Sequence, residues 1–355
     1  MLKKIFCLLV CCLMVGCINA PISESTQFTV QDALERTLEF SEYPERIVIA
    51  GKQTPMLANF YYLFPSKEER ISAIENRSQS QNIFLELIDD KYQSKLILEK
   101  GAGVEQIAPL NPDLVILKTS MKEKIGTGLE EVGIPVIYVS FEDIETIYKD
   151  IRLIGKVVDE EERAEEIILE YKKTYSEIKD KLASISDGKD LLLIQAQNVD
   201  QEYSFQVPSN TWLQTQMVKD LKSNPVWESA SLSGGWTDVN FEQILNWNPD
   251  DIFVINYRGQ SDEITMDLKN NELWKSFLSN NKINLAPFPY DFISWDQPDP
   301  RWILGYTWMA SELYPQQIGQ DYVIETVKEF YTLFYEMEED YIDTEILPGI
   351  SIYLK

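Results

Sequence analysis

Apolar residues recur at steps of three and four between Asp159 and Ser184, and the positions between them are almost all Glu, Lys and Asp. This spacing places the apolar side chains on one stripe of an α-helix. Asp159 can cap its start, and no Pro or Gly interrupts the pattern before Gly188. At roughly 1.5 Å per residue the helix would be ~36 Å long, about the width of a domain. The stripe consists of Ala164, Ile167, Ile168, Tyr171, Tyr175, Ile178 and Leu182.

Short apolar runs on both sides of this helix predict β-strands that alternate with helices. The first run follows Arg46 and is succeeded by a turn at Gly51 and a helical pattern through Phe60. Strand, turn and helix in this order begin an α/β unit. Two further helical runs, 302–313 and 323–334, predict closing helices. The predicted strands are 47–50, 114–117 and 135–139 before the long helix, and 191–194, 252–255 and 283–285 after it.

A sequence repeat relates the two sides of the long helix. Residues 104–117 read VEQIAPLNPDLVIL and residues 241–254 read FEQILNWNPDDIFV, so six of fourteen positions are identical. Each copy is predicted to be a helix that ends at Asn-Pro and is followed directly by a buried strand. The predicted fold class is therefore α/β, with two similar α/β lobes that have central, mostly parallel sheets and are joined by one long rigid helix. A cleft between two such lobes is the default site for a ligand.

The length of 355 residues exceeds what a single core usually takes, and 44% hydrophobic residues are typical of a globular chain. We expect an N-terminal α/β lobe at 41–143, a connecting helical spine at 144–186, and a C-terminal α/β lobe with closing helices at 187–355. The chain is expected to be a monomer. Its formal net charge of −26 argues against nucleic acid as a partner and against adhesion of the protein surface to anionic lipid. An anionic ligand would need a locally basic pocket.

The N-terminus predicts an export signal. Two lysines precede the apolar run 5–15, which is too short to span a bilayer as a mature helix. Met-Val-Gly-Cys at 14–17 resembles a bacterial lipobox, so residues 1–17 are assigned as a lipoprotein signal peptide with lipid on Cys17, and residues 18–40 as a tether. An uncleaved signal anchor is the alternative. All four cysteines lie in the signal segment, which leaves the folded part without a disulfide.

The loops after parallel strands and the N-termini of the following helices share one edge of a sheet, and this edge carries ligands. Gly-Ala-Gly at 101–103 and Gly-Gly-Trp-Thr at 234–237 precede the two repeat helices and are predicted to lie there. Basic side chains at this edge would suit the charged rim of a ligand, and aromatic side chains would suit a large flat or lipophilic ligand. The candidate cleft residues are Lys52, Gln53, Thr54, Lys118, Thr119 and Ser120 in the first lobe, and Gln195, Gln197, Trp236, Tyr257, Arg258, Phe288, Tyr290 and Trp295 in the second.

The residue types that are present or absent limit the metal-binding and catalytic functions that this sequence could have. Arg301 is expected to be structural and to brace its loop against Asp296 or Asp299. The sequence has no His, so imidazole cannot ligate a metal, a haem or the lower face of a corrinoid, while haem bound through Tyr stays open. There is no P-loop and no Gly-x-Ser-x-Gly. The acidic run 336–340 is expected to be a solvated helix end. We therefore expect no cofactor, no protein metal site and no catalytic residue, although catalysis by a pair of carboxylates stays open.

These features together resemble the iron-complex and cobalamin type of ABC-transporter solute-binding protein. The resemblance is carried by the lipobox, EQI and NPD before a strand, GIPV at 133–136, GGW followed by EQ and WNPD, and WDQPDPRWILGYTW at 295–308. It covers about residues 40–335. It implies one rigid helix between the lobes, a small closure on the ligand, and a ligand held between them. The implied partners are an ABC permease with its ATPase.

The resemblance also places a permease-docking glutamate at the start of the repeat helix in each lobe, here Glu105 and Glu242. Taken alone, each is an ordinary first-turn glutamate that favours the helix dipole. The predicted function is a lipid-anchored receptor on the outer face of the cytoplasmic membrane. It would capture a metal chelate, foremost a ferric siderophore, for an ABC importer. A corrinoid is the second choice and a molybdate or tungstate oxyanion the third. The alternative from another class is a surface-anchored α/β hydrolase that uses cleft carboxylates.

Overall fold

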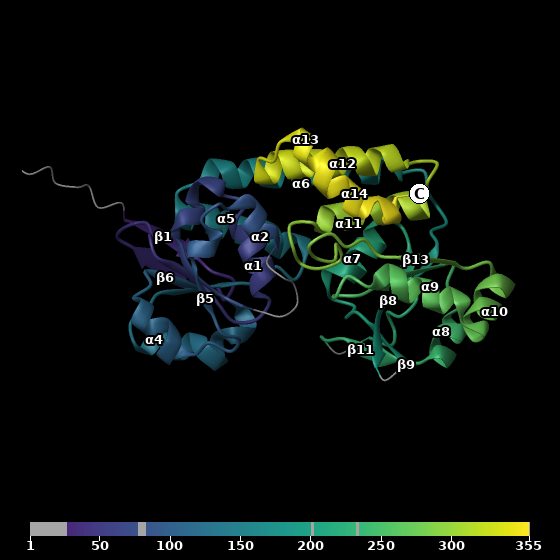
Figure 1. The fold of residues 1–355 in the computed structure, drawn as a ribbon, viewed down its shortest axis with the longest axis horizontal. Helices are drawn as coiled ribbons and strands as arrows, with labels where there is room; N and C mark the ends of the chain where they lie inside the picture. The colour runs from purple at the N-terminus through teal and green to yellow at the C-terminus, as the bar shows by residue number, and fades with distance from the viewer. Residues whose placement is uncertain (1–26, 77–82, 200–201, 232–233, 355) are drawn as a thin grey trace, which may run out of the picture.

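Two α/β lobes lie side by side, each built around its own sheet (Figure 1). The structure is a computed structural model, which describes residues 27–76, 83–199, 202–231 and 234–354. The N-terminal sheet has the strand order β5-β4-β3-β6-β7, and all its pairs are parallel. Its strands are β3 (Ile47–Ile49), β4 (Ile71–Glu75), β5 (Leu96–Leu98), β6 (Leu114–Lys118) and β7 (Val136–Val139).

The C-terminal sheet has the order β11-β9-β8-β12-β13, and β10 pairs with β8. Strands β8, β10, β12 and β13 are parallel, whereas β9 and β11 are antiparallel to their neighbours. The predicted fold class is confirmed, because the two repeat copies lie in two separate sheets. The strands are β8 (Asp190–Val199), β9 (Glu202–Val207), β10 (Asn224–Pro225), β11 (Thr237–Val239), β12 (Asp251–Ile255) and β13 (Asn284–Pro287).

Helices cover the faces of both sheets. The lobe helices are α1 (Thr54–Tyr61), α2 (Ile83–Ile88), α3 (Val104–Ile107), α4 (Thr127–Glu131), α7 (Leu213–Asp220), α8 (Phe241–Trp247), α9 (Ser261–Asn270), α10 (Glu272–Asn281) and α11 (Trp302–Leu313). The chain ends with α12 (Gln320–Tyr335), α13 (Glu339–Tyr341) and α14 (Leu347–Ile350).

The Asn-Pro-Asp sequence of each repeat has the same structural role in both lobes. Asn111 and Asn248 follow their helices in the left-handed conformation, with φ of 48° and 45°, and so end them. The side chains of Asp113 and Asp250 each accept a 2.9 Å hydrogen bond from a backbone N–H at the start of the neighbouring strand. The motif therefore joins a helix end to a strand start, which explains why the sequence repeats where the architecture does.

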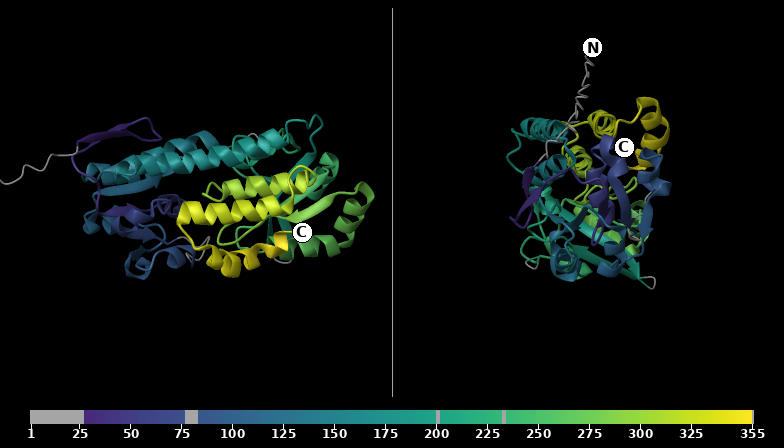
Figure 2. Two further views of the ribbon diagram at one scale, coloured as in Figure 1. Left: turned by 90° about the horizontal axis from the view of Figure 1, so that it is seen from above. Right: turned by 90° about the vertical axis from the view of Figure 1, so that its left-hand side faces the viewer.

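The predicted spine at 144–186 is two helices rather than one. α5 (Ile144–Val158) packs in the N-terminal lobe and ends at Asp159, whose φ of 62° breaks the helix. Asp159 therefore terminates α5 and does not cap the long helix, whose N-cap is Glu160. α6 (Glu161–Lys181) is unbroken and runs along both lobes (Figure 2). Its predicted stripe is buried except for Tyr175, which is half-buried.

α12 forms a second connection beside α6. Near its start the Tyr322 hydroxyl donates to Glu177 of α6 at 2.9 Å. At its end Arg163 of α6 donates to the backbone carbonyl of Leu333 at 2.5 Å, and the Tyr335 hydroxyl donates to the carbonyl of Asn59 in α1 at 3.1 Å. α12 thus reaches back to the N-terminal lobe, so two helices, α6 and α12, join the lobes rather than one.

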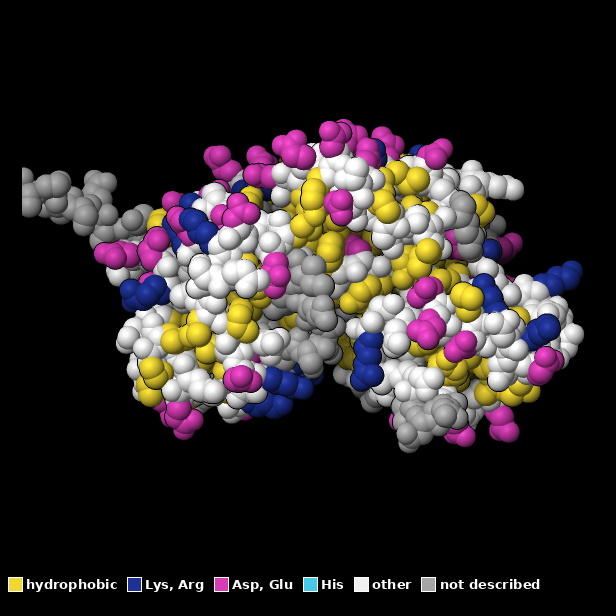
Figure 3. Space-filling model, in the orientation of Figure 1, with side chains coloured by type: hydrophobic (Ala, Val, Ile, Leu, Met, Phe, Trp, Pro, Cys, Tyr) yellow, Lys and Arg dark blue, Asp and Glu magenta, His cyan; other side chains and the backbone are white. Residues whose placement is uncertain are grey.

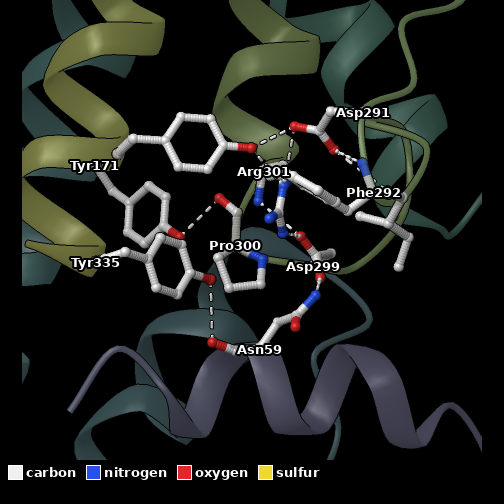
Figure 4. Close-up of polar contacts among 10 residues, drawn as sticks. Asn59, Tyr171, Asp291, Phe292, Asp299, Pro300, Arg301 and Tyr335 are labelled. Atoms are coloured by element: carbon white, nitrogen blue, oxygen red, sulfur yellow. Dashed lines mark hydrogen bonds and ion pairs between the residues drawn. The ribbon is translucent and has the colours of Figure 1, made fainter. Parts of the chain in front are cut away.

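A buried polar network closes the joint between the lobes (Figure 4). Arg301 is fully buried and pairs with Asp291 and Asp299, each at 3.1 Å. Its guanidinium lies 4.0 Å from the centre of the Phe84 ring of the N-terminal lobe. The expected structural role of Arg301 against Asp299 is confirmed. Asp291 is an additional partner, and Asp296 binds other residues.

Residues assigned to a tether form structure where the model describes them. β1 (Phe28–Gln31) pairs antiparallel with β2 (Thr37–Phe40), and Arg36 binds Asp32 at 2.6 Å and Glu130 of the N-terminal lobe at 2.5 Å. The part of the 18–40 segment from 28 onward is therefore a hairpin attached to the lobe. Its alternating Phe28, Val30, Leu38 and Phe40 are the signal that the tether assignment overlooked. Residues 1–17 with Cys17, and 18–26, lie outside the described residues.

Candidate functional site: a cleft between the lobes

A cleft of about 810 Å³ opens between the two lobes. Its N-terminal wall comes from the loops that follow β3, β5, β6 and β7, and its C-terminal wall from the start of α7 and the loops around β11, β12 and β13. The predicted edge, at the carboxyl ends of the parallel strands, is therefore the one that faces the cleft. The lining residues are Lys52, Gln53, Met56, Lys100, Ser120, Glu142, Asp143, Thr211, Trp212, Leu213, Gln214, Gly234, Trp236, Tyr257, Gln297 and Pro298.

Two lysines give the N-terminal wall its positive charge. Lys52 follows β3 and Lys100 follows β5, and both side chains are exposed. Neither ammonium has an ion-pair partner within the part of the chain that the structure describes. The two groups are therefore free to neutralise an anion in the cleft.

A buried carboxylate holds the two lysine loops together. Glu75, at the end of β4, accepts the backbone N–H of Gly51 at 2.6 Å and that of Gly101 at 2.8 Å. Gly51 and Gly101 have φ of 88° and 86°, which an L side chain rarely adopts. Because Lys52 follows Gly51 and Lys100 precedes Gly101, the Glu75 carboxylate fixes the spacing of the lysine backbones.

The carboxylates of the N-terminal wall are engaged within the protein. Glu142 pairs with Lys118 at 2.9 Å, and Asp143 caps α5 by accepting the N–H of Thr146 at 2.8 Å. Asp150 of α5 accepts the N–H groups of Ser140 and Phe141 at 2.6 and 2.8 Å and so holds the loop after β7. Burial raises the pKa of Asp150 to about 7.

Aromatic rings line the C-terminal wall. The ring centres of Trp212 and Trp236 are 5.6 Å apart, and those of Trp236 and Tyr257 are 5.9 Å apart. Both pairs meet edge to face, the arrangement that the ring quadrupole favours. All three rings are half-buried, so part of each remains available to a flat or apolar part of a ligand.

A second buried carboxylate lies directly behind this wall. Asp296 is 0% exposed, and its Oδ2 accepts the Tyr257 hydroxyl at 2.9 Å and Nε2 of Gln214 at 3.1 Å. The Ser294 hydroxyl donates to Oδ1 at 2.5 Å. Burial raises the pKa of Asp296 to about 6, and that of Tyr257 rises well above its usual value for the same reason.

Five of the candidate residues line the cleft: Lys52, Gln53, Ser120, Trp236 and Tyr257. The others lie elsewhere. Thr54 is buried and bonds to the carbonyl of Gly51, and Trp295 and Phe288 are fully buried in the core. Lys118 does not line the cleft: its side chain is buried, and its ammonium donates to the Ser140 carbonyl and pairs with Glu142. Thr119, Gln195, Gln197, Arg258 and Tyr290 do not line the cleft, and among them Gln195 is buried in β8 and Arg258 is exposed.

Sequence reasoning missed several lining residues. Lys100 follows the short apolar run Leu96–Leu98, which forms β5 but was not among the predicted strands. Trp212 and Gln214 lie at the start of α7, which carries no repeat motif. Gln297 and Pro298 could have been identified as candidates, because they lie in the WDQPDPRW segment on which the family resemblance rests.

The charges are unevenly distributed over the surface. In Figure 3 acidic side chains gather along the side of α12 and α13, while basic side chains stand at the lower edges of both lobes, beside the notch between them. Among the described residues, no group of three or more Asp, Glu, Cys or His side chains could hold a metal ion. Within the described part of the chain, no helix has the length and apolar composition of a membrane span.

A family model described as "periplasmic binding protein" matches residues 90–288, which is more than half of the chain. The chain belongs to the periplasmic binding protein family. The family resemblance seen in the sequence is thereby confirmed, and the protein is an extracytoplasmic solute-binding component of an ABC transporter.

Relatives of the family span almost the whole chain. The molybdate-binding protein MolA of Haemophilus influenzae is 21% identical over 350 residues, which cover 91% of this chain and 95% of that protein. The structure of MolA bound to molybdate has a TM-score of 0.71, at 17% identity over 88% of this chain and 98% of that one. A periplasmic solute-binding protein of Veillonella parvula has a TM-score of 0.73, at 24% identity over 92% of this chain and 98% of that one.

The two glutamates that the family resemblance singled out stand at equivalent places. Glu105 and Glu242 occupy the first turns of α3 and α8, both exposed, and neither has a hydrogen-bond or ion-pair partner among the described residues. α3 begins shortly after Lys100, and α8 begins shortly after Trp236, so the binding-protein cleft is flanked by one such glutamate on each lobe.

Proposed function

We propose that the protein captures an anionic metal chelate in the interlobe cleft, foremost a ferric siderophore, and delivers it to an ABC permease. The observation that carries this proposal is the composition of the two walls. The N-terminal wall offers the ammonium groups of Lys52 and Lys100, which have no ion-pair partner among the described residues, and the C-terminal wall offers the aromatic surface of Trp212, Trp236 and Tyr257. A chelate with a negative rim and flat organic ligands matches both.

The size of the cleft supports a ligand larger than a simple ion. Pockets of roughly 300–1,000 Å³ enclose ligands of drug size, and the cleft has about 810 Å³. A tetrahedral oxyanion would leave most of this space and most of the aromatic wall uncovered. A corrinoid is the second chelate of suitable size.

Molybdate or tungstate is the second candidate, and the specific observation in its favour is the similarity to MolA over 91% of the chain. Such an oxyanion would be neutralised by the two lysines of the N-terminal wall. The aromatic wall would then have no partner.

The protein is proposed to bind its ligand without converting it, and to act as a monomer. Lipid on Cys17 would hold it at the outer face of the cytoplasmic membrane. Glu105 and Glu242 are proposed to contact basic residues of the permease. Their exposure and their equivalent positions on the two lobes support this role.

Equilibrium dialysis followed by native mass spectrometry tests the ligand class. The protein is dialysed against a ferric tris-catecholate, a corrinoid and molybdate. We expect stoichiometric retention of the ferric chelate in unchanged form, and weaker retention by the Lys52→Gln/Lys100→Gln variant. If only molybdate is retained, the ligand is the oxyanion and not a metal chelate. Recovery of a chemically altered ligand would favour the alternative function of an α/β hydrolase.

A further inference from the structure

Asp296 organises the side chains of the C-terminal wall from behind. The carboxylate accepts three hydrogen bonds, from the Ser294 hydroxyl, the Tyr257 hydroxyl and Nε2 of Gln214. Tyr257 and Gln214 both line the cleft, whereas Asp296 is 0% exposed and does not. The carboxylate is therefore one residue removed from any ligand, and it acts only through these two side chains.

The charge of Asp296 is costly where it lies. Every hydrogen bond that it accepts comes from a neutral donor, and no Lys or Arg pairs with it in the described part of the chain. Burial of an ionised carboxylate without a cation is unfavourable, and the raised pKa of Asp296, about 6, reflects this cost. An Asn would fit the same space with a smaller penalty. Unlike an ionised carboxylate, however, the Asn side chain cannot act purely as a hydrogen-bond acceptor, because its NH₂ group also donates hydrogen bonds.

An ionised carboxylate fixes the direction of the hydrogen bonds around it. The single proton of the Tyr257 hydroxyl and one amide proton of Gln214 point inward, toward Asp296. The phenol oxygen of Tyr257 is itself within hydrogen-bond reach of the Gln214 amide group, whereas Oε1 of Gln214 has no hydrogen-bond partner among the described residues. This amide oxygen belongs to a side chain that lines the cleft. The C-terminal wall therefore presents the acceptor lone pairs of Gln214 at this point, opposite the two lysines of the N-terminal wall.

We propose that Asp296 is a positioning residue that makes this wall a hydrogen-bond acceptor, so that the ligand is an anion that also carries N–H or O–H groups. The inference rests on the proposed function and narrows its ligand class. An oxyanion without protons, such as molybdate at neutral pH, can satisfy the lysines but not the acceptors. Acceptors left unpaired when a ligand displaces water reduce its affinity, which is how a polar site rejects an analogue that lacks the matching group.

Two ferric chelates of equal charge and similar size provide the test. The tris complexes of ferric iron with protocatechuamide and with methyl protocatechuate differ only in that the first carries free amide N–H groups. Their affinities are measured by isothermal titration at neutral pH, together with that of molybdate. We expect the wild-type protein to bind the amide complex about tenfold more tightly than the ester complex.

Three variants separate the positioning role from a purely structural one. Asp296→Asn and Tyr257→Phe are both expected to reduce the preference for the amide complex to less than about threefold. Tyr257→Phe keeps the aromatic ring, so it tests the inference even if Asp296→Asn fails to fold. Asp251→Asn is the matched control: Asp251 is a buried carboxylate of the C-terminal lobe, bonded to Lys189 and Asn284, and it lies at the amino end of β12, away from the cleft. We expect it to retain the full preference.

The outcomes distinguish this inference from the proposed function. If the wild-type protein binds both chelates equally, or if Asp296→Asn weakens both without changing their ratio, the positioning role is wrong while chelate binding stands. If neither chelate binds, chelate capture itself is wrong and this inference falls with it. Molybdate bound more tightly than either chelate would likewise overturn both.

Discussion

Asn59 of the N-terminal lobe donates a hydrogen bond from Nδ2 to Oδ2 of Asp299 in the C-terminal lobe at 2.6 Å, and both side chains are buried. Asp299 also pairs with Arg301, so one carboxylate links the two lobes and the arginine of the joint. Asp299 stands next to Pro298, which lines the cleft. The wall that meets the ligand and the joint that sets the angle between the lobes therefore share one short segment.

Loss of this bond should loosen the joint. We expect Asn59→Ala to lower the free energy of unfolding by about 1–3 kcal/mol, because a buried acceptor loses its donor. Denaturant titration measures this change, and small-angle scattering with and without ligand measures the closure. The wild-type protein should close only slightly, and the variant more. Asn280→Ala, which removes an exposed amide bonded to Ser276, is the control and should have little effect. A large closure in the wild-type protein would contradict a stiff joint.

Arg301 should be the most sensitive residue of the joint. Arg301→Met leaves the buried carboxylates of Asp291 and Asp299 without their cation, and breaking a buried ion pair in this way costs about 3–5 kcal/mol. We expect a corresponding loss in the free energy of unfolding, measured by denaturant titration. Adding Asp291→Asn and Asp299→Asn to Arg301→Met should recover much of the loss. If the triple variant is no more stable than the single one, packing rather than charge explains the role of Arg301.

These relationships show what the sequence could and could not reveal. The Asn-Pro-Asp repeat was informative because the same backbone turn and strand attachment recur in both lobes, so the same residues recur. The cleft edge followed from the direction of parallel strands. The orientation of individual side chains could not be predicted in this way: Lys118 ends β6, yet its side chain is buried and its ammonium bonds to the Ser140 carbonyl and to Glu142, so that it does not line the cleft. Trp295 stands in the right segment, but Gly305 of α11 packs against its backbone and the ring is buried. Such choices depend on neighbours that are remote in sequence.

The lysine loops depend on Glu75. In Glu75→Gln the amide has a single acceptor oxygen for the N–H groups of Gly51 and Gly101, so one charge-assisted hydrogen bond is lost, at a cost of about 1.5–3 kcal/mol in stability. We expect the affinity for a ferric tris-catecholate to fall about tenfold as Lys52 and Lys100 lose their spacing. Isothermal titration measures both the variant and the wild-type protein.

The direction of this change is informative. Removing a negative charge near two lysines would by itself increase the affinity for an anion, so a decrease shows that positioning outweighs charge. Glu99→Gln, which removes an exposed charge beside Lys100, is the matched control and should not decrease the affinity. Equal or tighter binding by Glu75→Gln would show that the carboxylate does not position the lysines.

Stability should fall as the pH rises through the range of two buried carboxylates. Burial raises the pKa of Asp150 to about 7 and that of Asp296 to about 6, whereas an unfolded Asp titrates near 3.9. Between these values the folded protein holds protons that the unfolded chain has released. The stability that comes from this difference is fully present below about pH 4 and is lost as the pH rises through about 6 to 7.

We therefore expect a lower free energy of unfolding at about pH 8 than at about pH 5, and a smaller difference in Asp150→Asn. Asn fits because a single oxygen of Asp150 accepts both backbone N–H groups, and an amide oxygen can do the same without titrating. Denaturant titration at the two pH values measures the effect. Glu86→Gln, an exposed carboxylate in α2, controls for net charge. An unchanged pH dependence in Asp150→Asn would show that Asp150 does not titrate in this range.

Substitution of the two glutamates proposed to dock on the permease should separate transport from ligand binding. Glu105 and Glu242 are exposed, without protein partners among the described residues, and stand on the two lobes at either side of the cleft. If they meet basic residues of the permease, Glu105→Lys/Glu242→Lys turns two attractions into repulsions. We expect uptake of the ligand by cells to be abolished, while the affinity of the purified protein for a ferric tris-catecholate stays the same. Glu86→Lys/Glu272→Lys makes the same change in charge at first-turn glutamates of α2 and α10 and should preserve uptake. If the Glu105→Lys/Glu242→Lys variant still supports uptake, these glutamates only stabilise their helices through the helix dipole, and the docking surface lies elsewhere.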